Sequence, residues 1–174
     1  MNVVGVVEGA DWQVESWTAR GTHTEKRADF AGWHEDVHSL IDNIQTPFRW
    51  ALLTRDPLPV WGQGRVTLLG DACHPTQPFP AQGAVRAMEG GFILARALAG
   101  FDDVETALRR YEDARRDRTA RMVRGSSENT RRFHNPELAH FAGAAAYVDR
   151  EWQPERVRER YEWFLAYDAT KVPL

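Results

Sequence analysis

A candidate ligand site lies in residues 70–84, which read Gly-Asp-Ala-Cys-His-Pro-Thr-Gln-Pro-Phe-Pro-Ala-Gln-Gly-Ala. Asp71 follows a short apolar run, so we expect its carboxylate at the end of a buried strand, where it can accept hydrogen bonds from ligand hydroxyls. Three prolines stiffen the loop that follows, and Gly83 permits close backbone approach at the start of a predicted helix. The free amides and dipole of such a helix favour partial negative charge. The pattern predicts a site for a polyhydroxylated ligand with an electron-rich end, although an Asp in a proline-rich turn before a helix is also typical of a structural cap.

A second pattern, His34-Glu35-Asp36-Val37-His38, is similar to the helical motif in which two histidines bind zinc and a glutamate activates water. The two positions between the glutamate and the second histidine are normally uncharged, whereas one of them here is Asp36. No clear third ligand follows at a helical spacing. We therefore interpret this segment as the solvated face of an amphipathic helix and predict no metal site.

A third pattern is the arginine-rich stretch 105–132, which holds nine arginines against five acidic residues. Such a stretch could bind nucleic acid. Helical spacing, however, pairs Glu105 with Arg109, and Glu112 with Arg115 and Arg116, so the charges largely neutralise one another. A solvated helix face is the preferred interpretation. The Gly62-Gln63-Gly64 segment precedes a strand instead of a helix, so it does not fit a dinucleotide-binding turn.

The composition excludes several classes of partner. The 174 residues carry 22 basic and 25 acidic side chains, a formal net charge of −3, which gives no overall attraction to nucleic acid or to anionic membranes. No apolar run reaches the length of a membrane span, and the single cysteine, Cys73, cannot form an internal disulfide. The first residues lack the pattern of a secretory signal, so we expect a soluble, cytoplasmic protein. The nineteen Trp, Tyr and Phe residues fit either an ordinary core or the walls of an aromatic ligand pocket.

The elements that must position these residues follow from the periodicity of apolar side chains and from the turn residues. In chain order we expect a hairpin of residues 3–7 and 12–17, a helix over 26–43, a strand over 48–54, a strand over 65–69, a non-helical loop over 72–82, and helices over 83–99, from 102 or 103 to 133, and over 154–167. The predicted ligand residues thus belong to a strand, loop and helix in succession.

Residues 70–84 resemble the second flavin motif of class A FAD-dependent aromatic hydroxylases, in particular the salicylate and 3-hydroxybenzoate hydroxylase branch. The shared pattern is Gly-Asp-Ala-x-His-Pro, then a proline, then Gln-Gly-Ala opening a helix with Glu89 in its first turns. Residues 11–17, 30–34, 50–52, 55–59 and 109–112 also look like the C-terminal half of that branch. The resemblance covers nearly the whole chain and is weakest after about residue 136.

The resemblance implies an α+β fold, namely the C-terminal part of the FAD-dependent hydroxylase fold without its N-terminal dinucleotide-binding fold. It divides the chain into a partial substrate-side region (1–60), the second FAD-contacting motif (61–100) and a C-terminal helical region (101–174). In this family FAD is reduced by NADH or NADPH, and an oxygen atom is then transferred to a small phenolic or benzoate-type ring. We therefore expect those cofactors and a small aromatic substrate.

The cofactor-binding residues implied by the resemblance are Gly70, Asp71, Pro78, Gln82, Gly83 and Ala84. Asp71 would hold the ribityl hydroxyls of FAD, and Pro78 would lie against the flavin ring. The backbone of residues 82–84, at the helix start, would face the pyrimidine edge, where reduced flavin carries negative charge. The family carries its remaining flavin residues and its catalytic base upstream, so no catalytic residue is identified in this sequence.

Two departures from the family qualify the implied function. Glu89-Gly90-Gly91 stands where the family has Glu-Asp-Ala, which places two helix-weakening glycines in the flavin helix. In addition, the Gly-x-Gly-x-x-Gly fold that binds the ADP half of FAD is not in this sequence. We expect a C-terminal fragment that is inactive alone, and the candidate protein partners are an N-terminal half or further copies of the chain in a homo-oligomer. The alternative is a non-catalytic remnant or interaction module that pairs with a separate N-terminal half.

Overall fold

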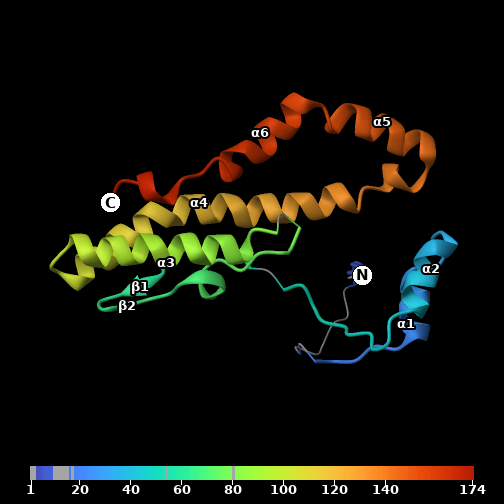
Figure 1. Ribbon diagram of the computed structural model, residues 1–174, viewed down its shortest axis with the longest axis horizontal. Coiled ribbons are helices and arrows are strands. Elements are labelled where there is room, and N and C mark those ends of the chain that lie inside the picture. Colours follow the sequence, from blue (N-terminus) through green and yellow to red (C-terminus); the bar gives the residue numbers. More distant parts are fainter. Residues whose placement is uncertain (1–2, 10–15, 17, 54, 80) are drawn as a thin grey trace. The chain divides into compact units, whose positions relative to one another are not determined.

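The computed structural model describes residues 3–9, 16, 18–53, 55–79 and 81–174. These residues are mostly helical with one small sheet, and the chain divides into a first unit, residues 1–52, and a second unit, residues 53–174 (Figure 1). The α+β expectation is therefore met as a helical fold with a minor β component. The three-part division at residues 60 and 100 stays a prediction.

The first unit contains two short helices, α1 (His23–Asp29) and α2 (Glu35–Asp42). Thr22 and Glu25 form a capping box at the start of α1, which satisfies two backbone amides that the helix itself leaves free. The expectation of one helix over 26–43 is wrong, because Gly32 adopts a left-handed φ of 81° and breaks the helical path.

Two predicted β segments of the first unit are not formed as expected. Residues 3–9 form no strand, and most of the second arm of the predicted hairpin, 12–17, lies outside the described residues. In the predicted strand 48–54, the described residues form only an isolated antiparallel bridge between Arg20 and Phe48. An isolated two-stranded pairing is marginal in water, so the short bridge is the physically reasonable outcome.

The sheet of the second unit pairs β1 (Gly62–Gln63) with β2 (Val66–Thr67) in antiparallel register. Gly64, with φ of 57°, makes the turn between them. The strand expected over 65–69 is thus confirmed only over Val66–Thr67, and the expectation that it is buried is wrong, because Val66 is 71% exposed. Asp71, expected at the end of this strand, lies four residues beyond Thr67. A short 3₁₀ helix, η1 (Gly70–Ala72), follows and leads into the loop before the next long helix.

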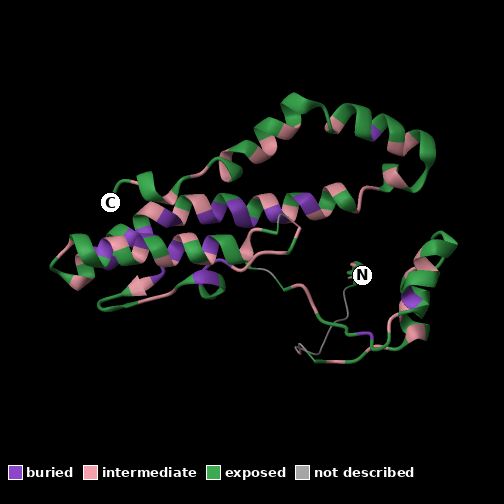
Figure 2. Ribbon diagram, in the orientation of Figure 1, coloured by how far each residue is buried: buried purple, intermediate pink, exposed green. Residues whose placement is uncertain are grey.

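Two long helices, α3 (Gly83–Gly100) and α4 (Val104–Phe133), form the centre of the second unit and lie side by side (Figure 1). Both were predicted from the sequence and are confirmed, including the cap at Asp103, whose carboxylate accepts the Thr106 amide at 2.9 Å. Their contact buries a cluster consisting of Trp61, Cys73, Ile93, Ala97, Ala107 and Tyr111. Figure 2 shows that buried residues are concentrated along these two helices.

The C-terminal part returns along α4. Its elements are η2 (Pro136–Ala139), α5 (Phe141–Glu151), α6 (Pro154–Leu165) and η3 (Ala169–Lys171). The predicted helix over 154–167 is confirmed to Leu165, whereas α5 was not predicted. Arg96 on α3 donates a hydrogen bond to the Ala169 carbonyl at 3.0 Å, which ties the end of the chain to α3. Among the described residues, no helix combines the length and apolar character needed to cross a bilayer.

Candidate functional site

Gly70 places the start of the predicted site beside the first turns of α3. Its φ of 62° lies in the left-handed region, and its carbonyl accepts the backbone amides of Cys73 and His74, each at 3.1 Å. A Cβ built on Gly70 would lie 3.5 Å from the Cβ of Ala87 on α3. The exposed side chain of Asp71 comes directly after this contact. Asp71 therefore follows a backbone position that lies against α3, and it is exposed to solvent.

The start of α3 is open to a ligand. Gln82 occupies the N-cap position without a side-chain hydrogen bond to the helix, and a Cβ built on Gly83 would meet nothing within 4 Å. The first amides of an α-helix have no partner within the helix, so those of Gly83 and Ala84 can be satisfied by water or by an acceptor group of a ligand. This end of α3 therefore offers accessible donors where partial negative charge is favoured.

Pro78 is exposed at the turn of the loop between η1 and α3. Its carbonyl accepts the Ala81 amide at 2.8 Å, and Ala81 adopts a φ of 52°. A left-handed conformation is unfavourable for a residue with a Cβ, and such residues are concentrated at sites where the surrounding structure holds them. The structure thus gives all six predicted cofactor residues, Gly70, Asp71, Pro78, Gln82, Gly83 and Ala84, to one η1–loop–α3 segment. Their roles in binding stay predictions.

Arg86 of α3 forms hydrogen bonds with two positions of this loop, one on each side of its central part. Its fully buried side chain donates from Nε to the Gln82 carbonyl at 3.2 Å and from Nη2 to the Thr76 hydroxyl. Burial lowers the pKa of Arg86 to about 10, which still leaves the guanidinium charged near neutral pH. Arg86 is a residue that the sequence analysis missed. The only sign of this role in the sequence is the position of Arg86 in the first turn of the predicted flavin helix.

His74 and Cys73, in the middle of the sequence motif, are buried and do not face solvent. Burial lowers the pKa of His74 to about 4, and the nearby Arg86 charge acts in the same direction, so the imidazole is neutral near pH 7. Burial also raises the pKa of the Cys73 thiol to about 11. A buried thiol with a raised pKa is a poor nucleophile, so Cys73 serves packing beside Trp61 instead of chemistry.

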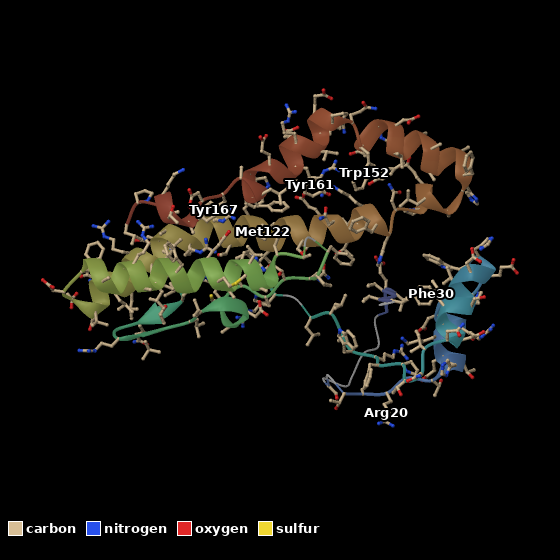
Figure 3. The ribbon with its side chains drawn as sticks, viewed as in Figure 1. Arg20, Phe30, Met122, Trp152, Tyr161 and Tyr167 are labelled. Atoms are coloured by element: carbon tan, nitrogen blue, oxygen red, sulfur yellow. The ribbon has the colours of Figure 1, made fainter. Side chains whose placement is uncertain are left out.

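Glu89 on α3 binds two arginines of α4. Its carboxylate receives Arg118 in a bidentate arrangement, at 3.1 and 2.9 Å, and Arg115 at 2.8 Å. The side chains of Arg115 and Arg118 are 0% and 9% exposed. Tyr167, near the end of the chain (labelled in Figure 3), accepts a hydrogen bond from Arg115 at 3.1 Å. The Arg118 guanidinium lies 3.4 Å from the centre of the Tyr167 ring.

This cluster corrects the interpretation of residues 105–132 as a solvated face. The predicted pairs of Glu105 with Arg109, at 3.9 Å, and of Glu112 with Arg116, at 3.3 Å, are confirmed. The predicted pair of Glu112 with Arg115 is wrong, because Arg115 turns into the contact between α3 and α4 and binds Glu89 there. Helical spacing identifies partners within one helix, so it could not reveal a carboxylate supplied by another helix.

The zinc-like pattern does not form a helical pair of histidines. His34 is the N-cap of α2, outside the helix, and its Nδ1 accepts the Asp36 amide at 3.3 Å. Its side chain is 72% exposed. Across the described part of the chain, no three His, Cys, Asp or Glu side chains gather in a way that could hold a metal ion.

A shallow hollow in the second unit lies elsewhere. It is lined by residues 60–63 and by Val66, around the β1–β2 turn, and none of the six predicted cofactor residues belongs to it. We place the candidate site at the η1–loop–α3 segment, because both the exposed carboxylate and the open helix start belong to it.

Comparison with known proteins gives consistent matches. The FAD binding domain family matches residues 13–126. The 6-hydroxynicotinate 3-monooxygenase of Bordetella bronchiseptica is 45% identical, over 99% of this chain and 39% of its own length. The 3-hydroxybenzoate 6-hydroxylase of Polaromonas naphthalenivorans is 37% identical, over 90% of this chain and 39% of its own. The crystal structure of Klebsiella pneumoniae HpxO complexed with FAD and uric acid is similar with a TM-score of 0.66 and 32% identity, over 79% of this chain and 36% of that one. This chain spans about two fifths of the length of the curated relatives it matches.

Proposed function

Since this chain belongs to the FAD binding domain family of aromatic-ring hydroxylases, we propose that its η1–loop–α3 segment binds the flavin part of FAD in a monooxygenase. The proposed substrate is a small phenolic or benzoate-type ring, and NADH or NADPH is the proposed electron donor. The Bordetella relative is named for 6-hydroxynicotinate and the Polaromonas relative for 3-hydroxybenzoate; both are small hydroxylated aromatic carboxylates, and the second is of the benzoate type. The ADP-binding half of the site would come from a segment outside these 174 residues.

The observation that carries the proposal is that one short segment holds both an exposed carboxylate, Asp71, and an open helix start at Gly83. Asp71 would accept hydrogen bonds from ribityl hydroxyls, Pro78 would lie against the ring, and the amides of residues 82–84 would face its pyrimidine edge. The open space at Gly83 and the uncapped N-terminus of α3 fit a flavin edge, because among the described residues other than its chain neighbours nothing lies within 4 Å of a Cβ built on Gly83. When bound, FAD supplies the redox chemistry by which oxygen is transferred to the substrate ring.

The experiment is to co-express this chain with the part of the Bordetella relative that this chain does not cover. We expect the purified complex to carry flavin absorbance and to oxidise NADH or NADPH only when an aromatic substrate is added. Asp71→Ala should reduce flavin affinity about 10- to 100-fold, since hydrogen bonds to a charged group contribute about 1.5–3 kcal/mol. Asp102→Ala, which removes an exposed carboxylate from the turn between α3 and α4, is the matched control and should bind flavin normally. A colourless, inert complex would refute the proposal.

A second candidate is an interaction module that pairs with an N-terminal half without catalysis. Three apolar side chains on α3, those of Val85, Met88 and Phe92, are 38%, 66% and 45% exposed and recur at helical spacing, which favours a protein partner on this side of the helix. The same co-expression distinguishes the two candidates. A stable complex without flavin would support the interaction module, whereas a flavin-containing complex with activity would exclude it.

A further inference from the structure

The residues on both sides of Pro78 are anchored to the C-terminal part of α4. Before Pro78, the Ser126 hydroxyl donates to the Gln77 carbonyl at 2.8 Å, and the Thr130 hydroxyl donates to the Gln77 side-chain oxygen. After Pro78, the ring of Phe79 packs against the ring of Phe133, with 5.7 Å between ring centres. Pro78 itself remains exposed between these two anchored neighbours.

The anchoring residues share one face of α4. Ser126, Thr130 and Phe133 are separated by four and three residues, the spacing that places side chains above one another on a helix. The Ser126 side chain is buried, with 1% exposure of the residue. A buried hydroxyl that bonds a backbone carbonyl costs more to remove than an exposed one, because the carbonyl is then left without its partner.

The two long helices divide the support of the loop between them. Arg86 of α3 bonds Thr76 and Gln82, which flank the central part of the loop. The α4 residues bond or pack against Gln77 and Phe79, which lie between those two points. Since α3 and α4 pack together along a buried contact, the loop is supported by a rigid pair of helices (Figure 1).

We propose that Ser126, Thr130 and Phe133 are positioning residues that fix Pro78 for contact with the ring of bound flavin. This inference rests on the proposed function, because it concerns the same loop. The mechanism is preorganisation: a loop that is already fixed loses less conformational entropy when a ligand binds to it. These side chains contact the loop and act through Pro78.

The first test measures loop order in the chain without flavin, by hydrogen exchange of the amides of Gln77, Phe79, Ala81 and Gln82. Ser126→Ala and Thr130→Val should each accelerate exchange of this segment about five- to tenfold, the effect of losing one buried hydrogen bond. Thr130→Ser keeps the hydroxyl and should restore slow exchange. Ser127→Ala is the matched control, because the Ser127 hydroxyl bonds the Val123 carbonyl within α4, at 3.4 Å, and does not serve the loop. Unchanged exchange in Ser126→Ala and Thr130→Val would overturn the proposal.

The second test measures flavin binding in the co-expressed complex. Ser126→Ala and Thr130→Val should weaken FAD affinity about threefold or more and shift the absorption spectrum of bound flavin, while Thr130→Ser and Ser127→Ala match the unmodified complex. Faster loop exchange with unchanged affinity and spectrum would overturn the positioning role. An unmodified complex that binds no flavin would instead refute the proposed function, and the exchange data identify this case because they are collected without flavin.

Discussion

The first unit, residues 1–52, keeps its main ion pair on the surface, whereas the second unit, residues 53–174, buries one between helices. The side chains of Arg27 and Asp42 in the first unit are 50% and 42% exposed. Arg115 and Arg118 in the second unit meet Glu89 with at most 11% exposure of any of the three side chains. Charges in water are strongly screened, while buried charges depend on their partners, so the two pairs have different energetic roles.

The same contrast holds for apolar burial. Among the described residues of the first unit, only Ile41 and Pro47 are buried, and much of the observed order comes from local devices such as the capping box at Thr22. The second unit instead buries the cluster between α3 and α4 (Figure 2). The candidate site is built on the well-packed unit, so its geometry is held by tertiary contacts and not by local turns alone.

Loss of the buried carboxylate should have the largest effect. Glu89→Gln leaves the guanidinium groups of Arg115 and Arg118 without a countercharge between the helices. Breaking a buried ion pair in this way costs about 3–5 kcal/mol, so we expect the urea-induced unfolding of the second unit to shift accordingly. Asp42→Asn, which breaks the exposed pair with Arg27, should leave stability unchanged. Equal shifts for both variants would contradict the contrast between the units.

The next prediction compares one truncation in two surroundings. Ile93 of α3 is fully buried in the core cluster of the second unit. Ile93→Ala should lower the free energy of unfolding of this unit by about 2–5 kcal/mol, because a cavity remains. Ile41→Ala in α2 should lower the stability of the first unit, measured by amide exchange, by less than this. The reason is that the exposed residues around Ile41 can move into the space left by its side chain. Similar losses in the two units would show that Ile41 has a rigid core around it after all.

The buried His74 predicts a pH dependence. Its pKa is about 4 in the folded protein and 6.5 in the absence of burial, so the unfolded chain binds a proton more readily. The contribution of neutral His74 to the free energy of unfolding is therefore fully present above pH 6.5. It is lost as the pH falls toward 4, and a shift of this size corresponds to about 3 kcal/mol. His74→Leu should remove this dependence from thermal unfolding curves. His34→Gln in the first unit changes an exposed side chain and should leave the pH dependence intact. If His34→Gln abolished the pH dependence, the assignment of this dependence to His74 would be contradicted.

The helices of the second unit were predicted well because their signals are local. Apolar spacing and the Asp103 cap gave α3 and α4 nearly to the residue. The break between α1 and α2 was missed, because the apolar spacing of the expected helix continues across Gly32 although its backbone turns left-handed there. The helix α5 is not predicted, although its alanines favour a helix, because its sequence has few large apolar side chains to show a helical spacing.

The candidate site was predicted in its composition but not in its support. The motif predicts the segment from Gly70 to Ala84, and its described residues form η1, a loop and the first two residues of α3. The side chains that hold it come from about 50 residues later in the chain, as with Gln77 and Ser126. Partners so distant in sequence are brought together only by the packing of α3 against α4, which no local pattern reports.

The smallest predicted effects concern glycines, and they have opposite signs in the two units. Gly91 lies in α3 with open space around the position of a Cβ, so Gly91→Ala should stabilise the second unit by up to about 1 kcal/mol through helix propensity. Gly90→Ala should stabilise the second unit less, because the added Cβ would lie only 3.1 Å from Leu69 Cδ1.

Gly32 of the first unit also has open space around the position of a Cβ, but its φ is 81°. Gly32→Ala should therefore destabilise the link between α1 and α2 by about 1–2 kcal/mol. Thermal unfolding and amide exchange measure these changes. Stabilisation by Gly32→Ala would mean that the left-handed break, and with it the two-helix form of the first unit, is incorrect.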